Sequence, residues 1–271
     1  MKICAPLFIS KFYYYSCGSV PGKGRELAIQ YIRKQIKNRK KTKYFCKLDI
    51  KKFFENIKPL IAFRALRKVI ADKKTLLLFA RILRFNKVRM PNGEITAKGL
   101  PIGFYTSPWI ANLVITEIDH IIKEKLRINV YVRYIDDMIL FHSNKRKLMH
   151  AVNVIICELS KLGLQLKHQP AIHLLDKQKV TFVGFQISRN IIKLNDRAFL
   201  RTTRSINKIS KKKQLNVFDA MRVVSSVGKF KYINGKLAFQ KYVTNKISLK
   251  HCVALISRKD RCKNGMAKSR R

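Results

Sequence analysis

Acidic residues are scarce in this chain. Its 271 residues contain 15 Asp and Glu against 59 Lys and Arg, which gives a formal net charge of +44. Such an imbalance destabilises the compact state by self-repulsion, so we expect a polyanionic partner, above all a nucleic acid. A heavily solvated lysine surface is the simpler alternative. An acidic membrane is less favoured, because the sequence shows neither an amphipathic membrane helix nor a lipidation signal.

Other absences narrow the class of protein further. The six cysteines form no Cys-x-x-Cys pair and lack the His spacing of a zinc site. Residues 1–9 are too short an apolar run for a secretory signal, and no stretch approaches the length of a transmembrane span. We therefore expect reduced thiols, a cytoplasmic location and no membrane partner. The hydrophobic content of 47% argues against disorder.

Two adjacent acids, Asp136 and Asp137, interrupt a β-branched and aromatic run at residues 130–141. The run predicts a hairpin with strands up to Tyr134 and from Met138, and with the two acids at the turn. Carboxylates held there are costly unless a cation meets them, and hard cations such as Mg²⁺ prefer oxygen ligands. Taken alone, the pair also fits an ordinary polar turn.

Asp49 is a third candidate, because it ends a short apolar strand at residues 44–49. The order of strand, helices, hairpin, helix and strand predicts an antiparallel sheet with helices packed on one face. In that arrangement Asp49 would approach the Asp136–Asp137 turn. Three converging acids would hold two divalent ions about 3.5–4 Å apart, which is the arrangement of two-metal phosphoryl transfer.

The other segments carry local signals. In chain order they are a Gly-rich loop at 16–25, a helix at 26–36, helical residues at 58–84, a hairpin turn at 91–93, a Gly/Pro loop at 99–108 with an N-cap at Thr106 or Ser107, a helix to 122, a helix at 145–162 capped by Ser143-Asn144, a strand at 164–167, a hairpin of strands 180–188 and 191–194, and a basic, partly helical region at 201–271. In the first loop Lys23 and Arg25 are positioned to meet phosphate, and a plain turn is the alternative.

Several of these motifs, in this order, resemble those of bacterial retroelement reverse transcriptases. They are Leu48-Asp49-Ile50 with Phe53-Phe54 (motif A), Gly99-Leu100-Pro101-Ile102-Gly103 with Ser107-Pro108 and Ala111-Asn112 (motif B), Tyr134-Ile135-Asp136-Asp137 (motif C) and Phe182-Val183-Gly184-Phe185 (primer grip). The resemblance implies an α+β right-hand polymerase. Its parts would be partial fingers at 1–44, a ferredoxin-like palm at 45–195 and a basic helical thumb at 196–271.

The resemblance also assigns residues. Two Mg²⁺ ions, for which Mn²⁺ can substitute, would be held by Asp49 and Asp136, with Asp137 and the Ile50 backbone in support. The nucleotide would meet Phe53, Phe54, Ile102, Gly103 and Lys167. Phe54 matches the steric gate against a 2′-OH, with a core Phe as the alternative, and Lys167 resembles a lysine proposed to protonate pyrophosphate. Nucleic-acid contacts would come from Lys23, Arg25, Arg133, Gly184, Arg201 and Arg204, with a structural role as the alternative for Arg133.

Two departures from the family pattern affect these assignments. Ile102 stands where many reverse transcriptases have Gln, so a hydrogen bond near the nucleotide is in doubt. Diversity-generating-retroelement enzymes share that aliphatic substitution, but they typically have Gln where Pro108 stands. Only 48 residues precede Asp49, so the expected fingers are minimal.

The resemblance implies an RNA-directed DNA polymerase of a bacterial or phage retroelement. Its partners would be an RNA template, a DNA primer and dNTPs, together with a non-coding RNA and an accessory protein. We expect a diversity-generating-retroelement-like enzyme, with a retron or phage-defence enzyme as the alternative. A retired polymerase fold that only binds RNA is disfavoured by the three intact acids, and an RNA-dependent RNA polymerase is disfavoured by Phe54.

Overall fold

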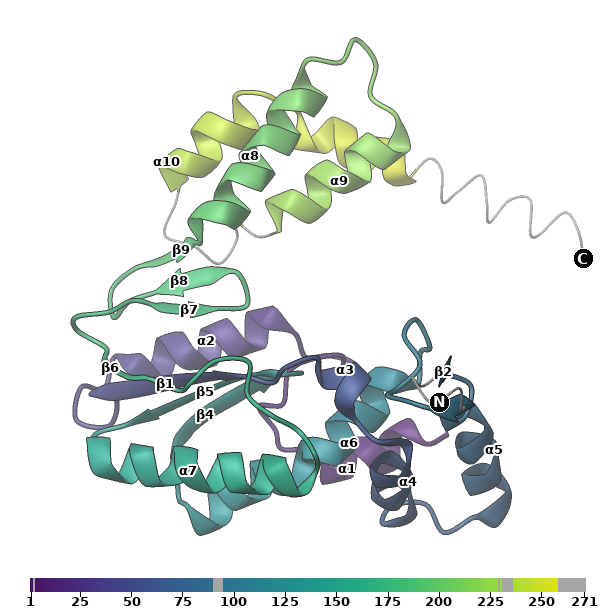
Figure 1. Ribbon diagram of the computed structural model, residues 1–271. Helices are drawn as coiled ribbons and strands as arrows, with labels where there is room; N and C mark the ends of the chain where they lie inside the picture. The colour runs from purple at the N-terminus through teal and green to yellow at the C-terminus, as the bar shows by residue number, and fades with distance from the viewer. Residues whose placement is uncertain (2, 90–94, 229, 231–235, 258–271) are drawn as a thin grey trace, which may run out of the picture. The chain divides into compact units, whose positions relative to one another are not determined.

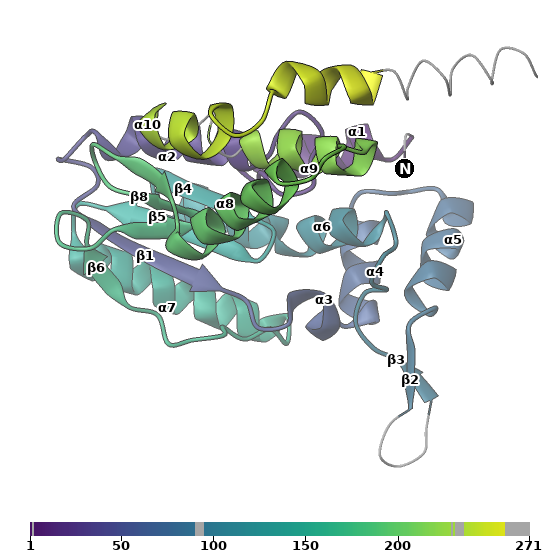
Figure 2. The same cartoon turned by 90° about the horizontal axis from the view of Figure 1, so that it is seen from above.

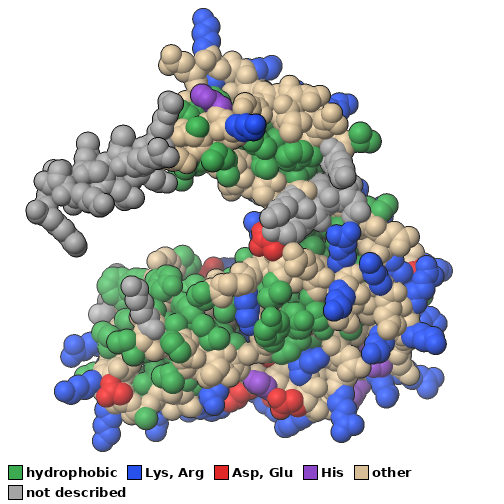
Figure 3. Space-filling model, turned by 180° about the vertical axis from the view of Figure 1, so that it is seen from behind, with side chains coloured by type: hydrophobic (Ala, Val, Ile, Leu, Met, Phe, Trp, Pro, Cys, Tyr) green, Lys and Arg blue, Asp and Glu red, His purple; other side chains and the backbone are tan. Residues whose placement is uncertain are grey.

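The computed structural model describes residues 1, 3–89, 95–228, 230 and 236–257. The chain forms two compact units, Met1–Gln178 and Lys179–Arg271. None of the described helices is both long and apolar enough to cross a membrane. Lys and Arg side chains are spread over the surface of each unit on the face drawn in Figure 3, as the composition leads one to expect.

The first unit is built on an antiparallel sheet whose strand order is β4-β5-β1-β6 (Figure 1). The strands are β1 (Tyr44–Asp49), β4 (Val130–Tyr134), β5 (Asp137–His142) and β6 (Ile172–Leu174). The helices are α1 (Ala5–Lys11), α2 (Arg25–Ile36), α3 (Phe53–Asn56), α4 (Pro59–Arg67), α5 (Lys73–Leu83), α6 (Ser107–His120) with its π-helical extension η1 (Ile121–Lys125), and α7 (Lys145–Lys161). A hairpin of β2 (Lys87–Arg89) and β3 (Ile95–Ala97) lies away from the main sheet (Figure 2). The turn predicted at 91–93 lies outside the described residues.

Helices cover both sides of this sheet, so the prediction of a single covered face was wrong. Side chains that alternate along the strands, such as Leu48 and Leu140, are buried in one core with α6 and α7. The opposite face buries Phe45 and Phe141, and α2 packs beside β4 through buried residues such as Ile32. Figures 1 and 2 both show α2 and α7 on opposite sides of the sheet. A strand that is apolar on both faces, as β4 and β5 are, requires this second cover.

Helix starts follow the predicted chemistry in part. Asn144 caps α7, because its side chain accepts a hydrogen bond from the Lys147 N–H. Thr106 occupies the N-cap position of α6 without a side-chain cap bond, and the Ser107 hydroxyl donates to the Pro101 carbonyl at 2.5 Å instead. That bond fastens the Gly/Pro loop to the first turn of α6.

The segment predicted as a strand at 164–167 is not one. It makes an isolated bridge between Leu166 and Ile50, and its Lys167 N–H donates to the Asp49 carbonyl at 2.7 Å. The segment therefore runs along the end of β1 as irregular backbone.

The second unit begins with a three-stranded antiparallel sheet of β7 (Val180–Phe182), β8 (Phe185–Ile187) and β9 (Ile192–Leu194). The strand predicted over 180–188 is two strands, since Val183 and Gly184 have φ of +42° and +89° and make a tight turn. The helical elements are α8 (Asp196–Ser210), α9 (Val217–Val227), α10 (Lys236–Phe239), the π-helical turn η3 (Gln240–Thr244) and residues 249–257. The prediction of a partly helical C-terminal region is therefore confirmed for its described residues.

Candidate active site

Strands β1 and β5 bring Asp49 and Asp137 side by side. Their register runs from Tyr44 opposite His142 to Asp49 opposite Asp137. Register partners in antiparallel strands have Cα atoms about 4.5–5.5 Å apart and side chains on the same face. Because Asp49 ends β1 and Asp137 begins β5, both carboxylates lie at one end of the sheet. By alternation this is the face opposite the core of α6 and α7.

Asp136 lies in the turn immediately before β5. The predicted hairpin is present, although only Asp136 is in the turn and Asp137 already belongs to the strand. Ile135 precedes it with a φ of +59°, a left-handed conformation that β-branched residues rarely adopt. The Ile50 N–H donates to the Asp136 carbonyl at 3.3 Å, which ties the turn to the residue after Asp49. We refer to Asp49, Asp136 and Asp137 as the acid edge.

The carboxyls of the acid edge are partly buried and repel one another. Burial raises the pKa of the Asp136 and Asp137 carboxyls, and the nearby Asp49 carboxylate raises both further. Lys47 opposes this effect, because its Nζ lies 3.0 Å from Asp137 Oδ1. Lys167 also lowers the pKa of Asp137. A cation placed at this edge would relieve the repulsion.

The donor chemistry of the acid edge suits a hard divalent ion, for which carboxylate oxygens are the preferred ligands. Within the described ranges, no three His, Cys, Asp or Glu side chains already stand as a closed metal-binding group. The Asp49 carboxylate nevertheless lies close enough to raise the pKa of both Asp136 and Asp137. The residues present therefore fit a divalent metal by their chemistry.

A cavity of about 440 Å³ lies between α3 and the start of α6. Four predicted nucleotide-binding residues line it: Phe53, Phe54, Ile102 and Gly103. Phe53 is buried and belongs to the core, whereas Phe54 is only half-buried. Ile102 is 76% exposed, and Gly103 has a φ of +87° with open space where a Cβ would be. The fifth predicted residue, Lys167, is exposed and is bonded through its N–H to the Asp49 carbonyl.

Arg133 does not present its side chain to a nucleic acid. It is completely buried, and its guanidinium donates to Asp119, Asn112 and the Ile135 carbonyl. This placement favours the structural alternative, because a buried guanidinium with satisfied donors cannot reach a phosphate.

Lys23 is also engaged within the protein. Its Nζ donates to the Tyr14 carbonyl at 2.6 Å and lies 4.7 Å from the centre of the Tyr14 ring. Arg25 begins α2 and is exposed, so of the two it is the freer to meet phosphate. The Gly-rich loop therefore resembles a folded turn more than an open phosphate cradle.

The remaining predicted contacts lie in the second unit. Gly184 forms the β7–β8 turn, and its carbonyl accepts a hydrogen bond from Asn195 at 3.0 Å. Arg201 and Arg204 are exposed on α8. Their spacing of three residues places both on one side of that helix.

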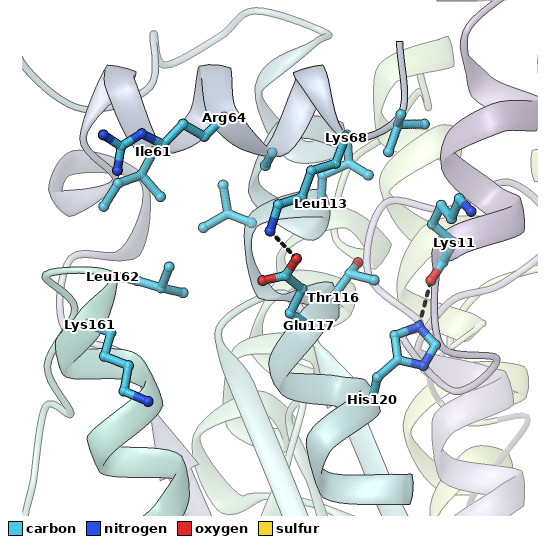
Figure 4. Close-up of a pocket in the computed structure, with 13 residues that line it drawn as sticks. Lys11, Ile61, Arg64, Lys68, Leu113, Thr116, Glu117, His120, Lys161 and Leu162 are labelled. Carbon is cyan, nitrogen blue, oxygen red and sulfur yellow. Dashed lines mark hydrogen bonds and ion pairs between the residues drawn. The ribbon is translucent and has the colours of Figure 1, made fainter. Parts of the chain in front are cut away.

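Another cavity, of about 420 Å³, lies among α1, α4, α6 and α7 (Figure 4). Its lining includes the ion pair of Lys68 with Glu117 and the hydrogen bond of His120 Nε2 to the Lys11 carbonyl. None of its lining residues belongs to the acid edge. It is separate from the candidate active site.

Sequence reasoning missed Lys47, although a signal was present. Lys47 lies two residues before Asp49 in a strand, so the two side chains share a face. A lysine at that spacing inside an otherwise apolar strand needs an anionic partner, and the hairpin acids were the available ones.

An antiparallel sheet with acids at the end of one strand and at the hairpin of its neighbour is the arrangement expected for the palm of a right-hand polymerase. The chain matches the family described as reverse transcriptase (RNA-dependent DNA polymerase) over residues 2–187. It belongs to that family.

Known relatives agree with this assignment. A retron Ec73 reverse transcriptase of Escherichia coli is 38% identical over 113 residues, which cover 37% of this chain and 33% of the relative. The match thus spans about a third of that relative's length.

Solved structures share the fold. An apo telomerase from Candida tropicalis aligns over 95% of this chain and 50% of its own, with a TM-score of 0.56 and 16% identity. An RNA-dependent RNA polymerase of a human picobirnavirus aligns over 98% and 57%, with a TM-score of 0.59 and 14% identity. At these identities the similarity shows the right-hand polymerase fold alone.

Proposed function

We propose that this chain is an RNA-directed DNA polymerase that adds dNTPs to the 3′-OH of a DNA primer on an RNA template. Membership of the reverse transcriptase family supports this, and the observation that carries it is the acid edge. A site retired from catalysis would gain nothing from keeping three mutually repelling acids at one end of a sheet.

In this proposal Asp49 and Asp136 are the principal metal ligands, and Asp137 supports them. Two Mg²⁺ ions, or Mn²⁺ in their place, would neutralise charge on the reacting phosphate oxygens. The chain's own part is to hold the carboxylates in place through the β1–β5 register and the Ile50–Asp136 backbone bond. The Ile50 peptide, which is bonded to the Asp136 carbonyl, would support them.

The cavity beside α3 is the proposed nucleotide site. Phe54 would exclude a 2′-OH by its bulk, while Ile102 and Gly103 would leave room for a base or backbone. Ile102 offers no hydrogen bond there, so selection in this proposal rests on shape. Lys167 would meet the leaving pyrophosphate from beside Asp49.

The proposed nucleic-acid partners follow from charge. A net charge of +44 favours a long polyanion, and exposed Arg201, Arg204 and Arg25 are positioned for phosphate. Gly184 lies in the proposed primer grip. The boundaries of fingers, palm and thumb at residues 44 and 195 are part of this proposal, as is a cytoplasmic location.

We infer a retron-type programme in preference to diversity generation. The similarity to a retron reverse transcriptase supports this choice. The main argument for a diversity-generating enzyme is the aliphatic residue Ile102. A structured non-coding RNA and an accessory protein are the partners that such a programme would add.

Primer extension tests the proposal directly. The purified chain, a DNA primer on an RNA template, Mg²⁺ and dNTPs should give extended product, and Asp136→Asn should reduce the rate by at least about 100-fold, since a metal site is worth several kcal/mol of transition-state stabilisation. Asp196→Asn, an exposed acid on α8, is the control and should leave the rate unchanged. Extension with NTPs instead would indicate an RNA polymerase. RNA binding without extension would indicate a retired fold.

A further inference from the structure

A buried polar cluster lies behind the acid edge, on the α6 side of the sheet. Arg133 and Asp119 are both completely buried and form an ion pair, with Nη2 to Oδ2 at 2.6 Å and Nε to Oδ1 at 2.9 Å. The Tyr131 hydroxyl donates to the same carboxylate at 2.6 Å. Well-packed apolar residues would often give a fold at least as stable as a buried ion pair. The cluster therefore calls for a role besides stability.

That role is indicated by the rest of the guanidinium. Arg133 Nη1 donates to the Ile135 carbonyl at 3.1 Å and to Asn112 Oδ1 at 2.7 Å. Ile135 is the residue with φ of +59°, and its carbonyl belongs to the peptide that leads into Asp136. A strained residue persists only where its surroundings over-determine it, and such residues concentrate at functional sites. Here the surroundings include a charged donor fixed by Asp119.

The N-terminal segment closes the turn from another side. The Asn112 amide donates to the Gly18 carbonyl at 2.9 Å, and the Cys17 N–H donates to the Arg133 carbonyl at 2.8 Å. A Cβ at Gly18 would stand 2.3 Å from Ile135 Cγ1 and 2.7 Å from the Ile135 backbone nitrogen. Only glycine fits at position 18 while the turn keeps this shape, because the second contact is with backbone.

We infer that Arg133, Asn112 and Gly18 are positioning residues that hold the Ile135–Asp136 peptide, and with it the Asp136 carboxylate, in the arrangement needed for reaction. This inference rests on the proposed function. Arg133 acts from the α6 face while Asp49 and Asp137 occupy the opposite face, and its buried guanidinium touches no substrate. The N-terminal segment thereby supports the active site by packing against the Ile135 turn, and not by a contact between Lys23 and phosphate.

The test uses two variants that disturb the turn by different routes. In Arg133→Lys the ammonium keeps a charge for Asp119, but a single point donor cannot span Asp119, Asn112 and the Ile135 carbonyl together. Gly18→Ala leaves the cluster intact and pushes on Ile135 directly. The matched control is Thr116→Val, which removes a buried α6 hydroxyl bonded to the Asn112 carbonyl at 2.8 Å without touching the turn.

Four quantities are measured: kcat for primer extension, the Kd for primer–template, the melting temperature, and amide hydrogen exchange across residues 134–138. Both test variants should lower kcat by about tenfold to a hundredfold, which is the scale of effect of a small misplacement of a reacting group. Exchange across the turn should become faster in both, and Kd should not change. Thr116→Val should keep kcat and the exchange rate at the turn, whatever its melting temperature.

The inference is overturned if either folded test variant keeps both the wild-type kcat and slow exchange at the turn. It is also overturned if kcat in all three variants simply follows the melting temperature. Should Arg133→Lys fail to fold, Gly18→Ala decides alone. If the wild-type chain does not extend a primer, the proposed function fails. The exchange comparison then still tests whether these residues hold the turn.

Discussion

Replacing Lys47 by Met removes the ammonium group that lies 3.0 Å from Asp137 Oδ1. Lys47 precedes Asp49 by two residues in β1, so the two side chains project from the same face of the strand. The Lys47 side chain therefore lies beside the acid edge. We expect the ammonium to stand in for a divalent ion when none is bound. A metal must then compete with Lys47 for Asp137.

The size of this competition follows from the geometry. Two unit charges 3 Å apart attract by about 1.4 kcal/mol in water and about 5.5 kcal/mol at an effective dielectric constant of 20. The Lys47 and Asp137 side chains are 35% and 23% exposed, so solvent screening brings the net value near the lower figure, about 1 kcal/mol. Lys47→Met should therefore destabilise the metal-free chain by about 1 kcal/mol. It should tighten divalent binding about fivefold, since 1.4 kcal/mol corresponds to tenfold.

Thermal unfolding over a titration of Mn²⁺ or Mg²⁺ measures both effects. Without metal, the melting temperature of Lys47→Met should fall by about 2–4 °C, the shift that 1 kcal/mol causes in a unit of this size. With increasing metal it should rise further, and at lower concentration, than that of the wild type. Lys47→Arg keeps the charge and should titrate like the wild type. Weaker or unchanged metal binding in Lys47→Met would refute the reasoning, because Lys47 would then assist the metal or be indifferent to it.

Three further predictions concern single side chains. Phe54→Val should raise the incorporation of ribonucleotides relative to dNTPs by about tenfold, because it removes bulk from a selective pocket. An unchanged NTP/dNTP ratio in primer extension would exclude Phe54 as the gate. Asn195→Ala should destabilise the second unit by about 1 kcal/mol in urea unfolding, because the Asn195 side chain accepts from the Ala198 N–H at 2.7 Å as the N-cap of α8; equal stability would show the cap to be dispensable. The hydrogen bond from Lys212 lowers the pKa of Asp219, so its contribution to stability is complete above the ordinary value of 3.8 and is lost as pH falls through the native pKa. Asp219→Asn should accordingly lose less stability than the wild type on acidification below pH 3.8, and parallel pH profiles would contradict this.

Local patterns predicted much of the palm. The strand ending at Asp49, the hairpin predicted at residues 130–141 and the helix predicted to be capped by Ser143-Asn144 all appear, because alternation, turn chemistry and capping act over a few neighbouring residues. The strand predicted at 180–188 failed for an equally local reason. The turn at Val183–Gly184 needs a positive φ at Val183. Because valine rarely adopts a positive φ, the sequence gives no signal for a turn there.

Contacts between distant segments were beyond the reach of those patterns. The resemblance assigned Arg133 to nucleic acid, with a structural role as the alternative, and the structure pairs it in the core with Asp119, fourteen residues earlier. Likewise Gly18 looked like part of a phosphate loop, and its real neighbour is Ile135. In both cases the partner is set by how α6 and the N-terminal segment pack on the sheet, which periodicity does not encode.

The acid edge has two energetic costs, which are repulsion among its carboxylates and backbone strain at Ile135. Different residues offset each of them. Repulsion among the carboxylates is reduced by Lys47, which lies on the same face of the sheet as Asp49 and Asp137 and pairs with Asp137. The strained backbone at Ile135 is held from behind by Arg133, in a network that no ligand needs to disturb. Separating the two has a consequence for binding. A metal that displaced Lys47 would meet carboxylates already held in place, so little of its binding free energy would be spent on ordering them. Changes at Lys47 should thus alter metal affinity and leave the turn intact, whereas changes at Arg133 should loosen the turn and lower kcat.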